Sequence, residues 1–198
     1  MKRRIWLWIL IGGSWGIVEW VGFQFLKPIF PAGSIGAGLT GFSIFFLGLA
    51  IFSSLPVRDL FLIALITAII KPFGLIAFGH PSWTSCLSGS LWIYGLETAV
   101  FAAAVTWIPC SIQRFSRFPL LWGAGIATFS AALFPLNSLL FGLPGCARPG
   151  TSIPLSFFYL PVSMICGAVA LWSAHCLNMA IKKARPSRTL TATSDQPF

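Results

Sequence analysis

The chain has 198 residues, of which 57% are hydrophobic and 9% charged, with a mean hydropathy of +0.86 and a net charge of +9. A soluble domain of this length carries about 25% charged residues. The composition therefore excludes a water-soluble globular protein and favours one whose main solvent is lipid. The positive charge does not indicate nucleic-acid binding, because the basic residues flank apolar stretches and form no patch.

Long stretches without a charged residue predict transmembrane helices. Four of them are Pro28–Val57, Pro72–Leu96, Phe118–Ala147 and Pro149–Ile181. Each is long enough for the roughly 20 residues that cross a bilayer as a helix, and backbone groups in hydrocarbon must bond within their own segment. We therefore predict an all-α integral membrane protein, a compact bundle of six transmembrane helices: Ile5–Phe25, Gly33–Leu55, Leu60–Phe78, Trp83–Ile108, Pro119–Phe141 and Pro154–Met179.

The two ends of the chain need separate interpretation. Basic residues before the first apolar stretch also describe a signal peptide. Glu19 interrupts that stretch and no A-x-A site follows it closely, so we expect a retained helix. Residues 1–181 are predicted to form one transmembrane domain, and residues 182–198 a short basic cytoplasmic tail without fixed structure.

The distribution of Lys and Arg predicts the orientation. Cytoplasmic loops carry an excess of these residues. With the amino terminus inside, two basic residues face outward, Lys27 and Arg148, and Lys71 lies within a span. The other ten face inward: Lys2, Arg3, Arg4, Arg58, Arg114, Arg117, Lys182, Lys183, Arg185 and Arg188. We expect a multi-pass protein of the cell (inner) membrane with both termini in the cytoplasm.

Three ionisable residues fall inside the predicted spans: Glu19, Lys71 and Glu97. Such groups are costly in hydrocarbon and indicate a functional site by default. Similar predicted depths make contact among them feasible. Trp15 lies on the same helical face as Glu19, and Pro72 is expected to bend the helix beside Lys71. The alternative is a buried ion pair that fixes helix packing alone.

Glu97 shares a helical face with further polar and aromatic residues. Trp83, Ser90 and Tyr94 follow one another along that face from the outer boundary to the carboxylate. This pattern predicts the wall of a polar pocket that opens outward. Asn137 in the fifth predicted helix is a further candidate for the pocket, or a satisfied polar residue beside a proline break.

Small residues indicate a docking face and an internal similarity. Gly12 and Gly16 form a small-xxx-small pair, which lets another helix approach closely, and we expect a partner's helix there. Residues 36–43 (GAGLTGFS) and 123–130 (GAGIATFS) are alike in two helices of opposite direction. This is typical of an inverted repeat, or of coincidence between segments rich in glycine and alanine.

The sequence gives no sign of catalysis, a metal site or a cofactor. His80 and His175 lie toward opposite sides of the predicted membrane. The HExxH, GxSxG and phosphate-loop motifs are lacking, and the five cysteines have no metal-ligand spacing. We predict a protein that is not an enzyme.

In its architecture, the chain resembles the S components of energy-coupling-factor vitamin transporters. The resemblance rests on six short helices, inward termini, about 200 residues and the Gly12–Gly16 face, and on no specific motif. It implies a membrane subunit that captures a small molecule from outside and works with a transmembrane coupling subunit and ATPase subunits. The candidate site residues suit a small cationic or aromatic solute, because Trp15, Trp83 and Tyr94 offer stacking faces beside two carboxylates.

Two other functions fit the same residues. One is a small secondary transporter or channel in which Glu19 or Glu97 binds a proton or cation. The other is a non-catalytic membrane protein whose glycine faces dock on partner helices. A subunit of an energised transporter needs ATPase subunits, whereas a secondary transporter does not.

Reporter fusions test the predicted orientation. A reporter that is active in the cytoplasm alone, fused after Phe198, should give a signal, as should an outside-active reporter inserted near Arg148. The reason is that positively charged loops stay in the cytoplasm. A silent cytoplasmic reporter at Phe198 would contradict the six-helix topology.

Overall fold

The computed structural model describes residues 2–26, 28, 32–77, 83–107, 116–141 and 159–184. These residues form six helices and no strand, which confirms the predicted all-helical fold. The helices are α1 (Lys2–Leu26), α2 (Ala32–Phe52), α3 (Val57–Ala77), α4 (Trp83–Trp107), α6 (Pro119–Phe141) and α8 (Leu160–Ala184).

Three of the described helices have the length and composition of membrane spans. Within the described residues, three stretches are long and apolar enough to cross a membrane: Arg4–Gly22 of α1, Gly89–Thr106 of α4, and α8 over its whole length. Shorter apolar stretches occupy Gly38–Phe52 of α2 and Pro119–Leu133 of α6. The structure is therefore consistent with a membrane protein.

α8 is longer than the sequence predicted. It continues past the expected end at Met179 to Ala184, so Lys182 and Lys183 form its last turn and do not belong to a tail. Cations stabilise the negative end of the helix dipole, which favours this extension. Residues 185–198 of the predicted tail lie outside the described part of the chain.

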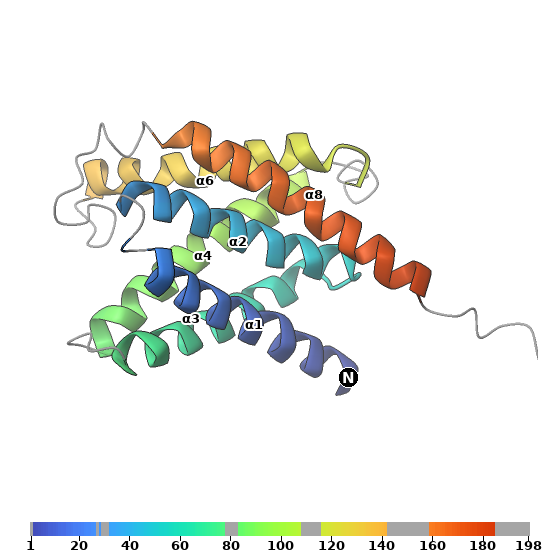
Figure 1. Ribbon diagram of the computed structural model, residues 1–198, viewed down its shortest axis with the longest axis horizontal. Helices are drawn as coiled ribbons and strands as arrows, with labels where there is room; N and C mark the ends of the chain where they lie inside the picture. Colours follow the sequence, from blue (N-terminus) through green and yellow to red (C-terminus); the bar gives the residue numbers. More distant parts are fainter. Residues whose placement is uncertain are drawn as a thin grey trace, which may run out of the picture.

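The helices pack in two groups. α3 packs against both α1 and α4, and we call these three helices the α3 group. α8 packs against both α2 and α6, and these form the α8 group. Figure 1 shows α2, α6 and α8 above α1 and α3, while α4 runs obliquely from the lower helices to the upper ones behind α2. α2 is the main link between the two groups, because it also contacts α1 and α4.

This arrangement does not follow an inverted repeat. In such a repeat α4 would pack against α8 as α1 packs against α3. Over the described residues, the extensive packing of α1 on α3 has no counterpart between α4 and α8. The likeness of residues 36–43 and 123–130 is thus explained by the small-residue composition of two membrane segments.

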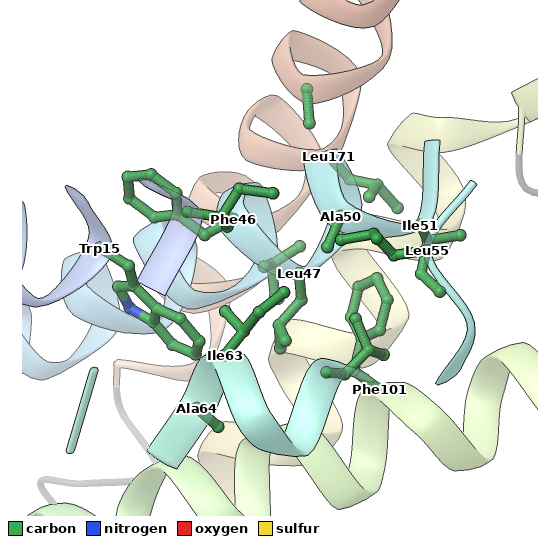
Figure 2. Close-up of a cluster of buried hydrophobic side chains, with 14 of the residues drawn as sticks. Trp15, Phe46, Leu47, Ala50, Ile51, Leu55, Ile63, Ala64, Phe101 and Leu171 are labelled. Carbon is green, nitrogen blue, oxygen red and sulfur yellow. The ribbon is translucent and has the colours of Figure 1, made fainter. Parts of the chain in front are cut away.

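The hydrophobic core lies where the two groups meet. Figure 2 shows part of this core, with Leu47 of α2 close to Ile63 of α3. Trp15 of α1 and Phe101 of α4 are fully buried within it. The outer faces are also apolar, and Trp6 is 71% exposed. Apolar residues on both sides are expected where lipid replaces water as the solvent.

Most charged residues gather at one end of the bundle. α1 and α6 begin there, α8 ends there, and α2 turns there into α3 (Figure 1, right). The basic residues of these helix ends therefore share that end: Arg4, Arg58, Arg117, Lys182 and Lys183. Lys71, in the interior of α3, is the exception among the described basic residues.

The turn between α2 and α3 is fixed by backbone and side-chain bonds. Ser54 has a φ of 64°, and the Leu55 amide donates to the carbonyl of Ala50 over 3.1 Å. This is the pattern that closes helix carboxyl ends. At the start of α3, buried Asp59 accepts a hydrogen bond of 3.0 Å from Trp8 Nε1. The bond ties α1 to α3 at the end where the basic residues gather.

Glycines let α6 and α8 approach closely. A Cβ atom added at Gly123 would lie 2.8 Å from the carbonyl carbon of Gly167 and 2.9 Å from Cβ of Leu171. A Cβ added at Gly125, also in α6, would meet no atom within 4 Å. The two positions thus differ in packing although they lie in one helix.

We expect Gly123→Ala to lower the free energy of unfolding in detergent by about 1–3 kcal/mol, the usual cost of overpacking. Gly125→Ala is the matched control and should leave stability unchanged or raise it slightly, because alanine favours helices. Thermal melting of both variants measures the difference. Equal melting temperatures would contradict the close contact between α6 and α8.

Candidate functional site

Glu19 is the centre of a buried polar cluster between the two groups. Its side chain accepts hydrogen bonds from helices α1, α3 and α4 and is 1% exposed. Trp15 Nε1 donates to Oε1 over 2.6 Å, and Lys71 Nζ donates to Oε2 over 2.8 Å. The Tyr94 hydroxyl also donates to Oε2. Glu19 is therefore held as a fully partnered carboxylate, paired with the Lys71 ammonium.

The aromatic residues of the cluster pack against one another. Trp15 meets Tyr94 edge to face, with ring centroids 5.1 Å apart, and stacks on Phe46 at 6.2 Å. Lys71 Nζ lies 5.0 Å from the centroid of the Tyr94 ring. The aromatic faces are thus already in contact with protein side chains, so a solute would have to separate them before it stacked there.

Glu97 is the second carboxyl of the cluster, and its environment differs. It is 5% exposed. Thr40 Oγ1 donates to its Oε1 over 3.3 Å, and Ser43 Oγ is bonded to its Oε2. The described residues contain two ion pairs, Lys71 with Glu19 and Arg58 with Asp59, and neither includes Glu97. Glu97 is therefore buried among hydroxyl groups while the nearby cation is paired with Glu19.

Ser43 connects the two carboxyls. Its Oγ is bonded to Glu97 and lies 3.2 Å from Glu19 Oε1, and also 3.2 Å from the carbonyl oxygen of Leu39. A hydroxyl has one proton to donate but also accepts hydrogen bonds. If both carboxyls were ionised beside one lysine, a negative charge would stay uncompensated in a buried site, at high cost. A proton on Glu97, donated to Ser43, removes that charge and lets Ser43 donate to Glu19.

The structure brings together five of the predicted site residues: Trp15, Glu19, Lys71, Tyr94 and Glu97. Ser90 is buried on α4, one helical turn before Tyr94. Trp83 and Asn137 belong to α4 and α6, but their side chains lie outside the described part of the chain. The predicted opening toward the outer side stays a prediction for the same reason.

The expected docking face on α1 needs correction. A Cβ at Gly12 would lie 2.7 Å from the carbonyl oxygen of Ile63, and one at Gly16 would lie 2.9 Å from Cγ2 of Ile70. Thr67 Oγ1 also donates to the Gly12 carbonyl over 3.0 Å. A helix does approach this pair closely, but it is α3 of the same chain. The face is therefore covered and not free to receive a partner's helix.

The contribution of α2 to the polar cluster was not predicted from the sequence. Thr40 and Ser43 lie three residues apart, on one face of a helix composed otherwise of small and apolar residues. That spacing of two hydroxyls in an apolar span was the available signal, because each needs a hydrogen-bond partner in lipid. Through them α2 joins the polar cluster.

An apolar groove lies beside the cluster and shares Phe46 with it. It has a volume of about 560 Å³ and runs between α2 and α8, with Phe42, Ile165 and Cys166 among its lining residues. None of the predicted site residues lines it. The groove therefore adds no polar group to the candidate site.

Comparison with known proteins gives no further guide. No family model, curated protein or solved structure matches this chain. The function is accordingly argued from the buried cluster and its charges.

The Glu19–Lys71 pair predicts a double-variant effect. Lys71→Met should lower the free energy of unfolding in detergent by about 3 kcal/mol, because it leaves a buried carboxylate unpaired. Adding Glu19→Gln should restore most of this loss, since no buried charge then lacks a partner. Thermal melting of the single and double variants measures the coupling.

Lys182→Met is the control, because Lys182 is an exposed residue in the last turn of α8. A surface change of this kind should alter stability by less than about 0.5 kcal/mol. If Lys71→Met melted like Lys182→Met, the ion pair would not stabilise the bundle.

Proposed function

We propose that this protein is a small secondary transporter of six transmembrane helices, in which Glu97 binds and releases a proton within the membrane. The observation that carries the proposal is the unequal environment of the two carboxyls. Glu19 has the Lys71 ammonium at 2.8 Å, while Glu97 is buried among hydroxyls. A buried carboxyl without a cationic partner favours its neutral, protonated form, and it becomes able to ionise when water or a cation reaches it.

The division of the bundle into two groups supports a transport cycle. The bonds of Glu19 to Trp15, Lys71 and Tyr94 all lie within the α3 group. Glu97 is hydrogen-bonded to Thr40 and Ser43, which belong to α2 of the α8 group. Movement of one group against the other breaks the hydrogen bonds of Glu97 and leaves the ion pair intact. Alternating access by rocking of two rigid groups works in this way.

The charges at the ends of the helices support the orientation. The basic residues at one end of the bundle are those expected on the cytoplasmic side of a membrane. We therefore place the start of α1 and the end of α8 in the cytoplasm. A proton that enters from outside reaches Glu97 along the face of α4 that carries Ser90 and Tyr94.

Infrared spectroscopy of the purified protein tests the protonation of Glu97. At neutral pH the protein should show the carbonyl band of a buried, protonated carboxylic acid, and Glu97→Gln should remove it. Glu97→Gln should also reduce proton uptake into proteoliposomes, driven by a pH gradient and followed with a pH-sensitive dye, by at least about tenfold. Loss of one strong, charge-linked interaction has this size.

Thr98→Val is the matched control on the same helix. Thr98 is fully buried next to Glu97, and its hydroxyl has no hydrogen-bond partner among the described residues. The substitution keeps the shape of the side chain, so the infrared band and proton uptake should both persist. A band that survives in Glu97→Gln would show that another group holds the proton and would refute the proposal.

A second candidate is a solute-capturing subunit that works with a coupling subunit and ATPase subunits. The convergence of Trp15 and Tyr94 on the carboxylate of Glu19 favours it, because such a site suits a cationic aromatic solute. Here the contact between the two rings has to open before the solute binds. Purification of the protein together with ATPase subunits would support this candidate over the secondary transporter.

A further inference from the structure

A second cavity lies at the end of the bundle where the basic residues gather. It has a volume of about 410 Å³ and is formed by residues 116–121, at the start of α6, and by Trp172 and His175 of α8. No residue of the Glu19 cluster lines it. The cavity is therefore a separate site and does not depend on the proposed transport function.

Arg117 gives this cavity a positive charge that has no carboxylate partner among the described residues. Its guanidinium is exposed and lies 5.5 Å from the ring centroid of Phe118. The acidic residues in the described part of the chain are Glu19, Asp59 and Glu97, which are all buried elsewhere. The ion pairs formed by the described residues do not include Arg117. Arginine in this condition is suited to a phosphate oxygen, which it binds with paired N–H groups.

His175 of α8 is a further polar residue that lines the cavity beside the start of α6. Its Nδ1 is buried and has no hydrogen-bond partner among the described residues. The ring packs edge to face on Phe52, with centroids 5.2 Å apart. The ring of His175 therefore forms part of the cavity wall and is held in place by its contact with Phe52.

Apolar side chains border the charged groups. Leu120 and Leu121 are 51% and 71% exposed, and Trp172 is 48% exposed. Half-exposed tryptophan is typical of the level where headgroups meet hydrocarbon. α6 begins at Pro119, which lines the cavity, so the positive end of the helix dipole lies beside the cavity. Charged groups beside exposed leucines match a ligand with an anionic head and acyl chains.

We propose that this cavity binds the phosphate group of an anionic membrane phospholipid. Arg117 and His175 contact the phosphate, Trp172 lies beside the glycerol region, and the acyl chains cover Leu120 and Leu121. Lys182 and Lys183 follow about two turns further along α8, where they add to the attraction for anionic lipid. A free phosphate ion would contact the same charged groups but would leave Leu120 and Leu121 uncovered.

Native mass spectrometry of the full chain in detergent tests this site. Phosphatidylglycerol should bind about tenfold more tightly than zwitterionic phosphatidylcholine, and Arg117→Gln should lower phosphatidylglycerol binding about tenfold, as expected for one charge-assisted contact. His175→Phe, which keeps a ring in place, should weaken binding by a smaller factor. Arg117→Lys should restore part of the affinity lost in Arg117→Gln.

Arg58→Gln is the control, because Arg58 is an exposed arginine at the same end of the bundle that pairs with Asp59 and lines no part of this cavity. It should leave phosphatidylglycerol binding within about twofold of the unchanged protein. If Arg58→Gln and Arg117→Gln lowered phosphatidylglycerol binding equally, the binding would depend on general surface charge and the proposal would be overturned. Displacement of the lipid by inorganic phosphate alone would assign the site to a free anion and would also overturn it.

Discussion

A charged lysine inside an apolar bundle is stable only when it is paired with a carboxylate. Lys71 meets this constraint through its contact with Glu19. The pair has an N–O distance of 2.8 Å and joins α3 to α1. Trp15 and Tyr94 bond to the same carboxylate, so α4 is joined as well. The α3 group is thus organised around one ion pair. Lipid cannot solvate either charge, and neither helix can therefore turn away without a large cost.

The same pairing determines what the second carboxyl can do. One ammonium neutralises one carboxylate, and Lys71 is committed to Glu19. Glu97 is then left with the hydroxyls of Thr40 and Ser43, which come from the other group of helices. Hydroxyls serve both a protonated and an ionised carboxyl, since they donate and accept. A stable pair and an adaptable carboxyl therefore lie side by side, and Ser43 links them.

Packing of small residues complements these polar contacts. Lipid removes the hydrophobic drive for helices to associate, so close contact and polar bonds must hold them. Gly12 and Gly16 let α3 pack closely against α1, and Gly123 lets α8 pack closely against α6. In the α8 group, Gly41 and Gly48 also bring α2 close to α8. The junction between the groups instead contains the polar cluster and large side chains such as Phe46 and Phe101.

The sequence by itself determined the helical class, the positions of the six helices and the three buried ionisable residues, because charge-free length and the cost of charge in lipid are local properties. Tertiary structure decided that Glu19, and not Glu97, pairs with Lys71. It also decided that Gly12 and Gly16 serve contact with α3, and that Thr40 and Ser43 complete the cluster. These helices are apolar on nearly every side, so hydropathy does not reveal which face meets lipid and which meets a neighbour. Only the packing of the helices against one another fixes the rotation of each helix about its own axis.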